Sequence, residues 1–296
     1  MRSFDYHRAA DLKEACRLMG ELPKAQILAG GTDLLVDIDS GLRHAENVVS
    51  LRDISELKRI QKVGNRISIG AGCSAADVES NELIREHLPE LAEMVVMFAS
   101  PQIRNRATVA GNICSAVPCG DFPPILIALG AEVELCSSSG TRALPLEDFF
   151  HGNRETVRQE NEILTRILVP IKPDGAAANY QKFRRRAANS LALVSVAAYL
   201  EMSDNLCSRA RIVLGSVAPI PLSAKKAGRS LEEKPVDDAA IASAAGIARD
   251  EACPITDQRG TETYRRQLVE VLTKRALRQV LRVINGNVTG KRADHE

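Results

Sequence analysis

Leu28-Ala29-Gly30-Gly31-Thr32-Asp33 is the stretch that decides the fold of this chain. The apolar run at 26–29 predicts a strand, and the apolar residues at 34–38 predict a brief helix. A strand that ends in two glycines and enters a helix presents unobstructed backbone N–H groups, to which phosphate oxygens bind well. Glycine allows both a positive-φ turn and close approach of a ligand. The same pattern is also typical of an ordinary turn between a strand and a helix.

Two known phosphate-binding motifs resemble this stretch only in part. It is not a P-loop, because no Gly-Lys-Ser/Thr follows the two glycines. Asp53 ends the next predicted strand about twenty residues on, where a Rossmann fold places its ribose-binding acid. The third glycine position of that motif is held by Leu34 or Leu35, however. Phosphate binding and a simple turn therefore both stay open on spacing alone.

A second loop of small residues, Thr108-Val109-Ala110-Gly111-Asn112, offers further backbone donors with a hydroxyl and an amide. Two such loops suggest a pyrophosphate that is held from both sides. Arg104 and Arg106 precede the loop and can add a charge-assisted bond to phosphate. The alternative is that both arginines cap neighbouring helices or face solvent.

Periodicity and turn residues predict a small α/β unit over the first fifty residues, followed by further strands and helices up to residue 169. The predicted elements are a helix over 11–22, strands over 26–29 and 48–51, a hairpin over 57–70 that turns at 64–65, short helices over 75–98 that break at Pro89, a helix over 122–129, and strands over 131–136 and 162–169. Segment 100–121 has no clean period, so we expect an irregular loop there.

The pattern changes after the turn-rich segment 172–178, which predicts a domain boundary. Beyond it we expect strands over 180–184, 193–202 and 208–217, and helices over 224–233, 237–252 and 261–284. The last helix carries an apolar stripe of Tyr264, Leu268, Leu272, Ala276, Val280 and Ile284. Opposite it lie the basic residues Arg265, Arg266, Lys274, Arg275, Arg278 and Arg282.

Composition excludes several classes of protein. With 39 Lys+Arg against 38 Asp+Glu the formal charge is +1, and Glu262 and Glu270 interrupt the basic face, so we expect no nucleic-acid binding. No apolar run approaches the roughly 18 residues of a membrane span. Seven scattered cysteines fit reduced thiols, so we expect a cytoplasmic protein. Neither a metal-ligand spacing nor a nucleophile elbow is present in the sequence.

Taken together, the motifs at 29–33, 101–105 and 108–114 resemble the FAD-binding medium subunit of the molybdenum hydroxylases. This family includes the medium chain of carbon monoxide dehydrogenase and the FAD chain of bacterial xanthine dehydrogenase. The similarity extends from Phe4-Asp5-Tyr6-His7 through 119–124 to 180–186, and thus covers nearly the whole chain.

The resemblance implies an α+β fold. Residues 1–174 would form a two-subdomain FAD-binding domain of the vanillyl-alcohol-oxidase (PCMH) type, with subdomains at about 1–55 and 56–174. Residues 175–288 would form a C-terminal domain of the CO dehydrogenase flavoprotein type, with an antiparallel sheet and three helices. Residues 289–296 would form a tail.

The resemblance also implies FAD as the cofactor of this chain, with no catalytic and no metal-binding residue. Carried over by position, the FAD contacts are Ile27, Leu28, Ala29, Gly30, Gly31, Thr32, Asp33, Thr108, Ala110, Gly111, Asn112, Asp121, Leu164 and Lys182. Ala110 stands where the family more often has glycine. If position 110 needs a positive φ, the alanine costs about 1 kcal/mol. We expect non-covalent FAD, because no His or Cys lies within 26–33.

The implied function is electron transfer from [2Fe–2S] clusters of a small subunit, through FAD, to an external acceptor such as NAD or a quinone. The molybdenum cofactor would lie on a large subunit, and the complex would be a dimer of heterotrimers. The chain lacks the cysteine-rich insert of the 4-hydroxybenzoyl-CoA reductases. Two alternatives stay open, a self-contained flavin oxidoreductase of the same fold and a flavin-free assembly subunit.

Overall fold

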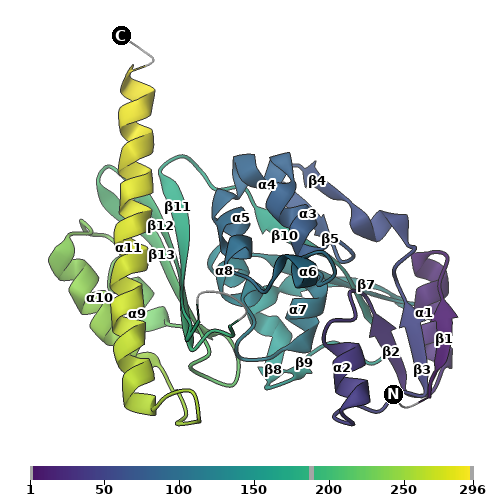
Figure 1. The fold of residues 1–296 in the computed structure, drawn as a ribbon. Coiled ribbons are helices and arrows are strands. Elements are labelled where there is room, and N and C mark those ends of the chain that lie inside the picture. The colour runs from purple at the N-terminus through teal and green to yellow at the C-terminus, as the bar shows by residue number, and fades with distance from the viewer. Residues whose placement is uncertain (1–2, 187–189, 294–296) are drawn as a thin grey trace. The chain divides into compact units, whose positions relative to one another are not determined.

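The computed structural model describes residues 3–186 and 190–293, with side chains as far as residue 286. The chain divides into two compact units, whose elements Figure 1 labels. The first unit holds residues 3–116 and 131–170. The second unit holds residues 117–130, 171–186 and 190–293. Segment 117–130 thus leaves the first unit and belongs to the second by its contacts.

A three-stranded parallel sheet opens the first unit. Its order is β1 (Asp5–Arg8), β3 (Asn47–Ser50), β2 (Ala25–Leu28). Helix α1 (Leu12–Glu21) begins at Asp11, whose side chain accepts the N–H of Glu14 at 2.7 Å. Helix α2 (Leu34–Asp39) follows β2. The helices expected over 11–22 and 34–38, and the strands over 26–29 and 48–51, are confirmed to within a residue, whereas β1 was not predicted.

The second sheet of this unit is antiparallel. Its order is β4 (Ile60–Val63), β5 (Arg66–Gly70), β10 (Ile163–Pro170), β6 (Glu132–Ser137), β7 (Gly140–Pro145), and a small separate sheet pairs β8 (Phe150–Gly152) with β9 (Glu155–Thr156). The hairpin of β4 and β5 turns at Gly64, as predicted, with a φ of +58°. Side chains of this sheet alternate, and Ile67, Ile69, Val133 and Ile167 are buried.

In chain order, short helices of the first unit lie between β5 and β6. They are α3 (Ala75–Ser80), α4 (Glu82–His87), α5 (Pro89–Val96), α6 (Pro101–Arg104) and α7 (Val109–Ser115), with 3₁₀ turns at Ser55–Lys58 and Leu146–Phe149. Pro89 starts α5, in keeping with the break predicted there. The irregular loop expected over 100–121 was wrong in part, because α6 and α7 form within it. Helices of four and seven residues are too short to show a period.

The second unit is built on an antiparallel sheet in the order β11 (Ala176–Phe183), β12 (Val194–Ser203), β13 (Leu206–Gly215), β14 (Leu222–Ser223). Asp204 and Asn205 connect β12 to β13 with φ angles of +51° and +63°. Two consecutive positive φ angles suit the right-handed twist of a tight hairpin. Strand β11 starts at 176, inside the segment that turn residues marked as a boundary.

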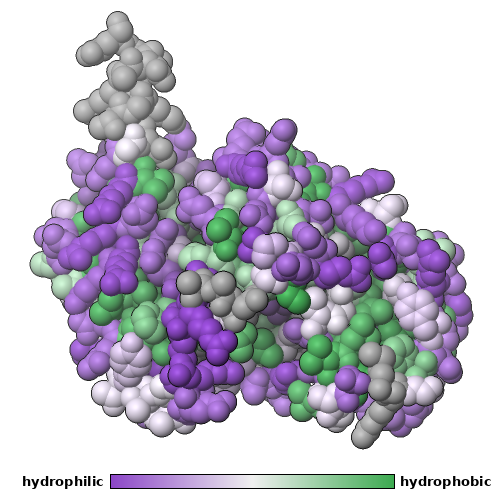
Figure 2. Space-filling model, in the orientation of Figure 1, coloured by the Kyte–Doolittle hydropathy of each residue, from purple (hydrophilic) through white to green (hydrophobic). Residues whose placement is uncertain are grey.

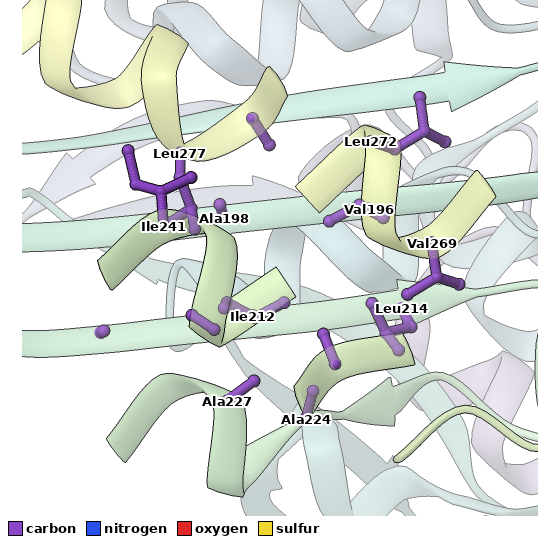
Figure 3. Packing of buried hydrophobic residues seen from close by; sticks show 14 of the residues in the cluster. Val196, Ala198, Ile212, Leu214, Ala224, Ala227, Ile241, Val269, Leu272 and Leu277 are labelled. Carbon is purple, nitrogen blue, oxygen red and sulfur yellow. The ribbon is translucent and has the colours of Figure 1, made fainter. Parts of the chain in front are cut away.

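Helices cover both faces of this sheet. On one face, Val196, Ala198 and Leu214 pack against α9 (Lys225–Arg229), α10 (Asp238–Glu251) and α11 (Glu262–Ala293), as Figure 3 shows. Helix α8 (Phe122–Ala128) packs against β11, β12 and β13, and Arg211 on the other face of β13 donates to its Ala128 carbonyl at 2.9 Å. Segment 117–130 is therefore the second helical cover of the sheet.

The stripe predicted on α11 is buried from Leu268 to Ile284, but two of the assignments at its start were wrong. Tyr264 is 41% exposed and meets the ring of Phe183 edge-on. Arg265 is 4% exposed rather than solvated, because its guanidinium donates to the Leu193 carbonyl at 2.8 Å and to Asp257 at 2.7 Å. Among the described residues, no helix is long and apolar enough to cross a membrane. Hydrophilic side chains cover much of the face in Figure 2.

Candidate functional site

Residues 29–33, here called the first loop, connect β2 to α2 in the first unit. Gly31 has a φ of +80°, and a Cβ there would lie 3.1 Å from Leu28 Cδ1 and 3.2 Å from Leu35 Cδ1. Glycine at this position therefore serves the turn and the apolar packing around it.

The first loop keeps its backbone donors available. None of the N–H groups of residues 29–33 donates to an acceptor in the described part of the chain, and the first backbone bonds of α2 run from Leu35 to Gly31 and from Asp37 to Asp33. Residues 29–32 are half-buried. Partly buried N–H groups without a partner favour binding of an anionic oxygen.

Residues 108–112, the second loop, form the start of α7. Thr108 Oγ1 accepts the N–H of Gly111 at 2.9 Å, and a Cβ on Gly111 would lie 2.8 Å from that oxygen. The Ala107 carbonyl, which precedes the loop, accepts the Ala75 N–H at 2.8 Å. The N–H of Ala110 meets no acceptor within residues 3–186 and 190–293. The second loop is thus fixed against α3 and keeps the Ala110 N–H available.

The two loops are interlocked. A Cβ on Gly30 would lie 2.0 Å from the carbonyl oxygen of Arg106, so the backbone just before the second loop occupies that space. The hydroxyl of Ser115, at the end of α7, donates to Asp33 at 2.5 Å. Sequence reasoning explained the two glycines by a positive-φ turn and by ligand approach, whereas Gly30 is required by the contact between the loops.

Ala110 lies inside α7, and it is not among the residues with positive φ. The condition for the expected strain is therefore absent, and the alanine carries no backbone cost. Leu164, another predicted contact, is 3% exposed on β10, opposite Leu135 of β6. Helix α7 packs against β10, so this strand supports the second loop.

A salt bridge that the sequence did not reveal braces the first loop. Arg154 lies between β8 and β9 with a φ of +63°, and its guanidinium donates to the buried carboxylate of Asp37 in α2 at 2.7 Å. The N–H of Arg154 donates to the carbonyl of Ala116, just past α7. Arg154 therefore ties the helices that follow both loops.

The charged residues considered for phosphate and ribose recognition have separate places. Asp53 pairs with Arg8 at 2.5 Å, which holds the pKa of Asp53 below its usual value. Arg104 pairs with Glu79 at 3.1 Å and donates to the Phe98 carbonyl, so its role is structural. Arg106 is exposed and has no ion pair among the described residues. Of these side chains, Arg106 is the one available to an anion.

Asp121 and Lys182, which were carried over as further flavin contacts, belong to the second unit. Lys182 Nζ lies 2.8 Å from Asp121 Oδ2, with the two side chains 1% and 6% exposed. The hydroxyl of Tyr180 donates to Asp121 Oδ1 at 2.7 Å. Burial, reinforced by the Asp121 charge, raises the pKa of Tyr180 well above its usual value. The three side chains form a buried cluster on the sheet face beside α8, in which the Tyr180 phenol is neutral.

An α+β chain with two interlocked loops of small residues and available N–H groups is typical of a protein that binds a nucleotide cofactor. Comparison with known families supplies the particular class. Residues 2–172 match the model of the FAD binding domain in molybdopterin dehydrogenase, and residues 153–280 match the CO dehydrogenase flavoprotein C-terminal domain. This chain belongs to the FAD-binding medium subunits of the molybdenum hydroxylase family, which are subunits of oxidoreductases.

Individual relatives agree with this family over almost their full length. The carbon monoxide dehydrogenase medium chain of Afipia carboxidovorans is 33% identical over 93% of this chain and 96% of that protein. The glyceraldehyde dehydrogenase medium chain of Sulfolobus acidocaldarius is 31% identical over 94% of this chain and 98% of that protein. The predicted family is confirmed.

A solved structure of carbon monoxide dehydrogenase from Hydrogenophaga pseudoflava contains a chain that superimposes with a TM-score of 0.92 at 33% identity. The match covers 95% of this chain and 98% of that chain. The predicted fold class is confirmed as well.

Proposed function

We propose that this chain binds one FAD non-covalently through its two loops and serves as an electron-transfer subunit. Electrons would come from [2Fe–2S] clusters on a small subunit and leave for an external acceptor such as NAD or a quinone. The relatives named medium chain or FAD-binding subunit support this role. The observation that carries it is the pair of interlocked loops in which the N–H groups of residues 29–33 and of Ala110 have no described acceptor.

FAD fits the first unit on chemical grounds. Its pyrophosphate is an anion that needs several converging donors, and residues 29–33 and Ala110 offer backbone N–H groups within two loops that touch. We assign Thr32, Thr108 and Asn112 to the polar groups of the nucleotide and Arg106 to a phosphate charge. Ile27, Leu28, Ala29 and Leu164 would supply the apolar side of the site.

When bound, FAD can take up electrons singly and release them in pairs, which suits a relay between an iron–sulfur cluster and a two-electron acceptor. This chain's residues bind and orient the cofactor. Substrate hydroxylation would take place at a molybdenum cofactor on a large subunit, which would also select the substrate. The complex would be a cytoplasmic dimer of heterotrimers. We also propose domains at 1–174 and 175–288. Asp121 and Lys182 would be further flavin contacts.

The test is expression of the chain alone and together with its large and small partners. The chain alone should bind about one FAD, which acid denaturation releases, and should oxidise no aldehyde, purine or N-heterocycle. The purified complex should contain molybdenum and iron. A folded chain that takes up no added FAD would favour the flavin-free assembly subunit. Substrate oxidation by the chain alone would favour a self-contained oxidoreductase.

A matched pair of glycine variants links the flavin to the first loop. Gly31→Val should abolish FAD binding, because Gly31 has positive φ and its Cβ position is crowded by Leu28 and Leu35. Gly64→Val is the control, since Gly64 also has positive φ but no atom lies within 4 Å of its Cβ position. The control should lose some stability and keep its FAD.

A further inference from the structure

Two cysteines that are 120 positions apart meet inside the first unit. Cys16 on α1 and Cys136 on β6 have their Sγ atoms 3.8 Å apart, and both are free thiols. Ala15, Cys16 and Met19 form the buried face of α1, which packs against β2, β3 and β6. The cysteine pair therefore bridges the parallel and the antiparallel sheet.

Contacts around Cys16 and Cys136 hold α1 against the end of β6. Cys136 is the next-to-last residue of β6, and the hairpin that leads to β7 follows it. One helical turn beyond Cys16, a Cβ on Gly20 would lie 3.8 Å from Ser138 Oγ in that hairpin. The small residues at positions 16 and 20 thus allow the hairpin to lie against α1.

The two thiols differ in access to solvent. Cys16 is 3% exposed, whereas Cys136 is partly exposed near the end of its strand. Burial raises the pKa of the Cys16 thiol to about 12, with a contribution from Cys136. The thiolate is the reactive form of cysteine, and the raised pKa keeps Cys16 protonated. An oxidant therefore reacts first with the more exposed Cys136, and Cys16 reacts second.

We propose that Cys16 and Cys136 form a reversible disulfide when the protein meets a peroxide, and that this bond fastens α1 to β6. A disulfide joins sulfurs about 2 Å apart, so a small movement of the two side chains closes the gap. The site is a redox modification site, independent of the flavin.

The reaction balances with hydrogen peroxide as the oxidant. The Cys136 thiolate attacks one peroxide oxygen, the O–O bond breaks, and a sulfenic acid and one water result once a proton is taken up. The Cys16 sulfur then attacks the Cys136 sulfur, the S–O bond breaks, and the second water leaves with the Cys16 proton. Two thiols lose two electrons in total, and the peroxide is reduced to two waters.

The disulfide would close a long loop of chain that contains both loops of the candidate site. Closing a long loop lowers the entropy of the unfolded chain more than closing a short one. The oxidised protein should therefore melt several degrees higher than the reduced protein. Oxidation should also slow hydrogen exchange of α1 and β6.

The experiment treats the purified chain with hydrogen peroxide, blocks the remaining thiols and maps disulfide-linked peptides by mass spectrometry. We expect a Cys16–Cys136 link that dithiothreitol reverses, and the rise in melting temperature with it. Cys16→Ala and Cys136→Ala should each abolish both effects. Cys253→Ala, at an exposed cysteine elsewhere, is the matched control and should leave both unchanged.

Folded, oxidised protein in which Cys16 and Cys136 both stay reduced would overturn the proposal. The same holds if the two sulfurs pair with other cysteines, or if Cys136 proceeds to a sulfinic acid without a link. The peptide map of the wild-type chain decides the question even if a variant fails to fold. Because it reads thiols, its outcome does not depend on whether the chain binds FAD.

Discussion

The interlocked loops of the first unit and the sheet–helix core of the second unit are held by opposite means. In the second unit, Val196, Ala198, Leu272 and Leu277 are at most 2% exposed and belong to one apolar cluster. In the first loop, the N–H groups of residues 29–33 have no described acceptor, and residues 29–32 are half-buried. Apolar packing thus stabilises one region by itself, whereas the other keeps backbone donors that the proposed FAD would satisfy.

The energetic consequences of this difference are distinct. Burying a large apolar side chain stabilises a fold by about 1.5–3 kcal/mol, regardless of ligand. A buried donor without a partner costs about 1–3 kcal/mol, which a bound anion offsets. FAD should therefore stabilise the first unit and leave the intrinsic stability of the second core unchanged.

A large loss of FAD affinity is expected for Gly30→Ala. A Cβ 2.0 Å from the Arg106 carbonyl oxygen forces the two loops apart, so the converging donors are lost. We expect FAD affinity to fall at least ~100-fold, equivalent to about 2.7 kcal/mol, as measured by fluorescence titration. Gly246→Ala, in α10 with no atom within 4 Å of the added Cβ, is the control and should bind FAD normally. Normal binding by Gly30→Ala would refute the interlock.

Leu277→Ala tests the apolar core of the second unit. Leu277 is fully buried between α11 and the second sheet (Figure 3), so its truncation should lower the free energy of unfolding by about 2–5 kcal/mol. Denaturant unfolding measures this loss. The folded fraction should keep wild-type FAD affinity, and a tenfold loss of affinity there would show that the two regions are not separable in the way described.

Acid titration should reveal the contribution of one ion pair, Arg142 with Glu162, to the stability of the first unit. Hydrogen bonds from Arg142 hold the pKa of Glu162 below its usual value, against the opposing effect of burial. A lowered folded-state pKa means that the pair stabilises the protein above about pH 4.3, and that this contribution is lost as pH falls through the lower value. Because Arg142 is half exposed, we expect about 1 kcal/mol.

Glu162→Gln should remove that acid-dependent share while it preserves the shape of the side chain. Stability measured between pH 7 and pH 3 should fall less steeply in the variant than in the wild type. Identical slopes would mean that the Arg142–Glu162 pair contributes nothing to the pH dependence of the first unit.

The smallest effect is expected on the exposed side of α11. Arg278 pairs with Asp238 at the surface, and Arg275 is exposed. Reversal of both charges to Glu should leave FAD content unchanged and at most slow assembly with an acidic partner surface in a salt-dependent way. Filter binding should detect no DNA retention by the native chain at physiological salt, and loss of flavin in the double variant would give the helix a role at the cofactor site.

Elements with a clear period were predictable from sequence, and those fixed by distant contacts were not. The hairpin at Gly64 and the apolar stripe from Leu268 to Ile284 follow from local patterns. The short helix α7 has a local cap at Thr108, but it also depends on the contact of Ala107 with Ala75 at the start of α3, which no short window of sequence contains. Arg265 was assigned to a solvated face because its acceptors, Leu193 and Asp257, come from other elements.

The chemistry of the candidate site was easier to predict from sequence than the contacts that hold its loops together. The two loops stand out by their small residues, and Gly31 has the positive φ that the turn pattern indicates. The reason for Gly30 and the brace from Arg154 to Asp37 could not be read from spacing, because both depend on segments brought together by folding. Strain at Ala110 was expected only if that position needed a positive φ. The position is helical, so the strain does not arise.

Hydrogen exchange of the purified chain with and without FAD tests the central claim most directly. FAD should slow exchange at residues 29–33 and at Ala110, while Val196, Ala198 and the buried side of α11 exchange equally slowly in both samples. Peptides that cover 64–66, at the exposed hairpin turn, serve as an internal reference that should not change. FAD binding that leaves exchange of residues 29–33 and of Ala110 unaltered would contradict the account.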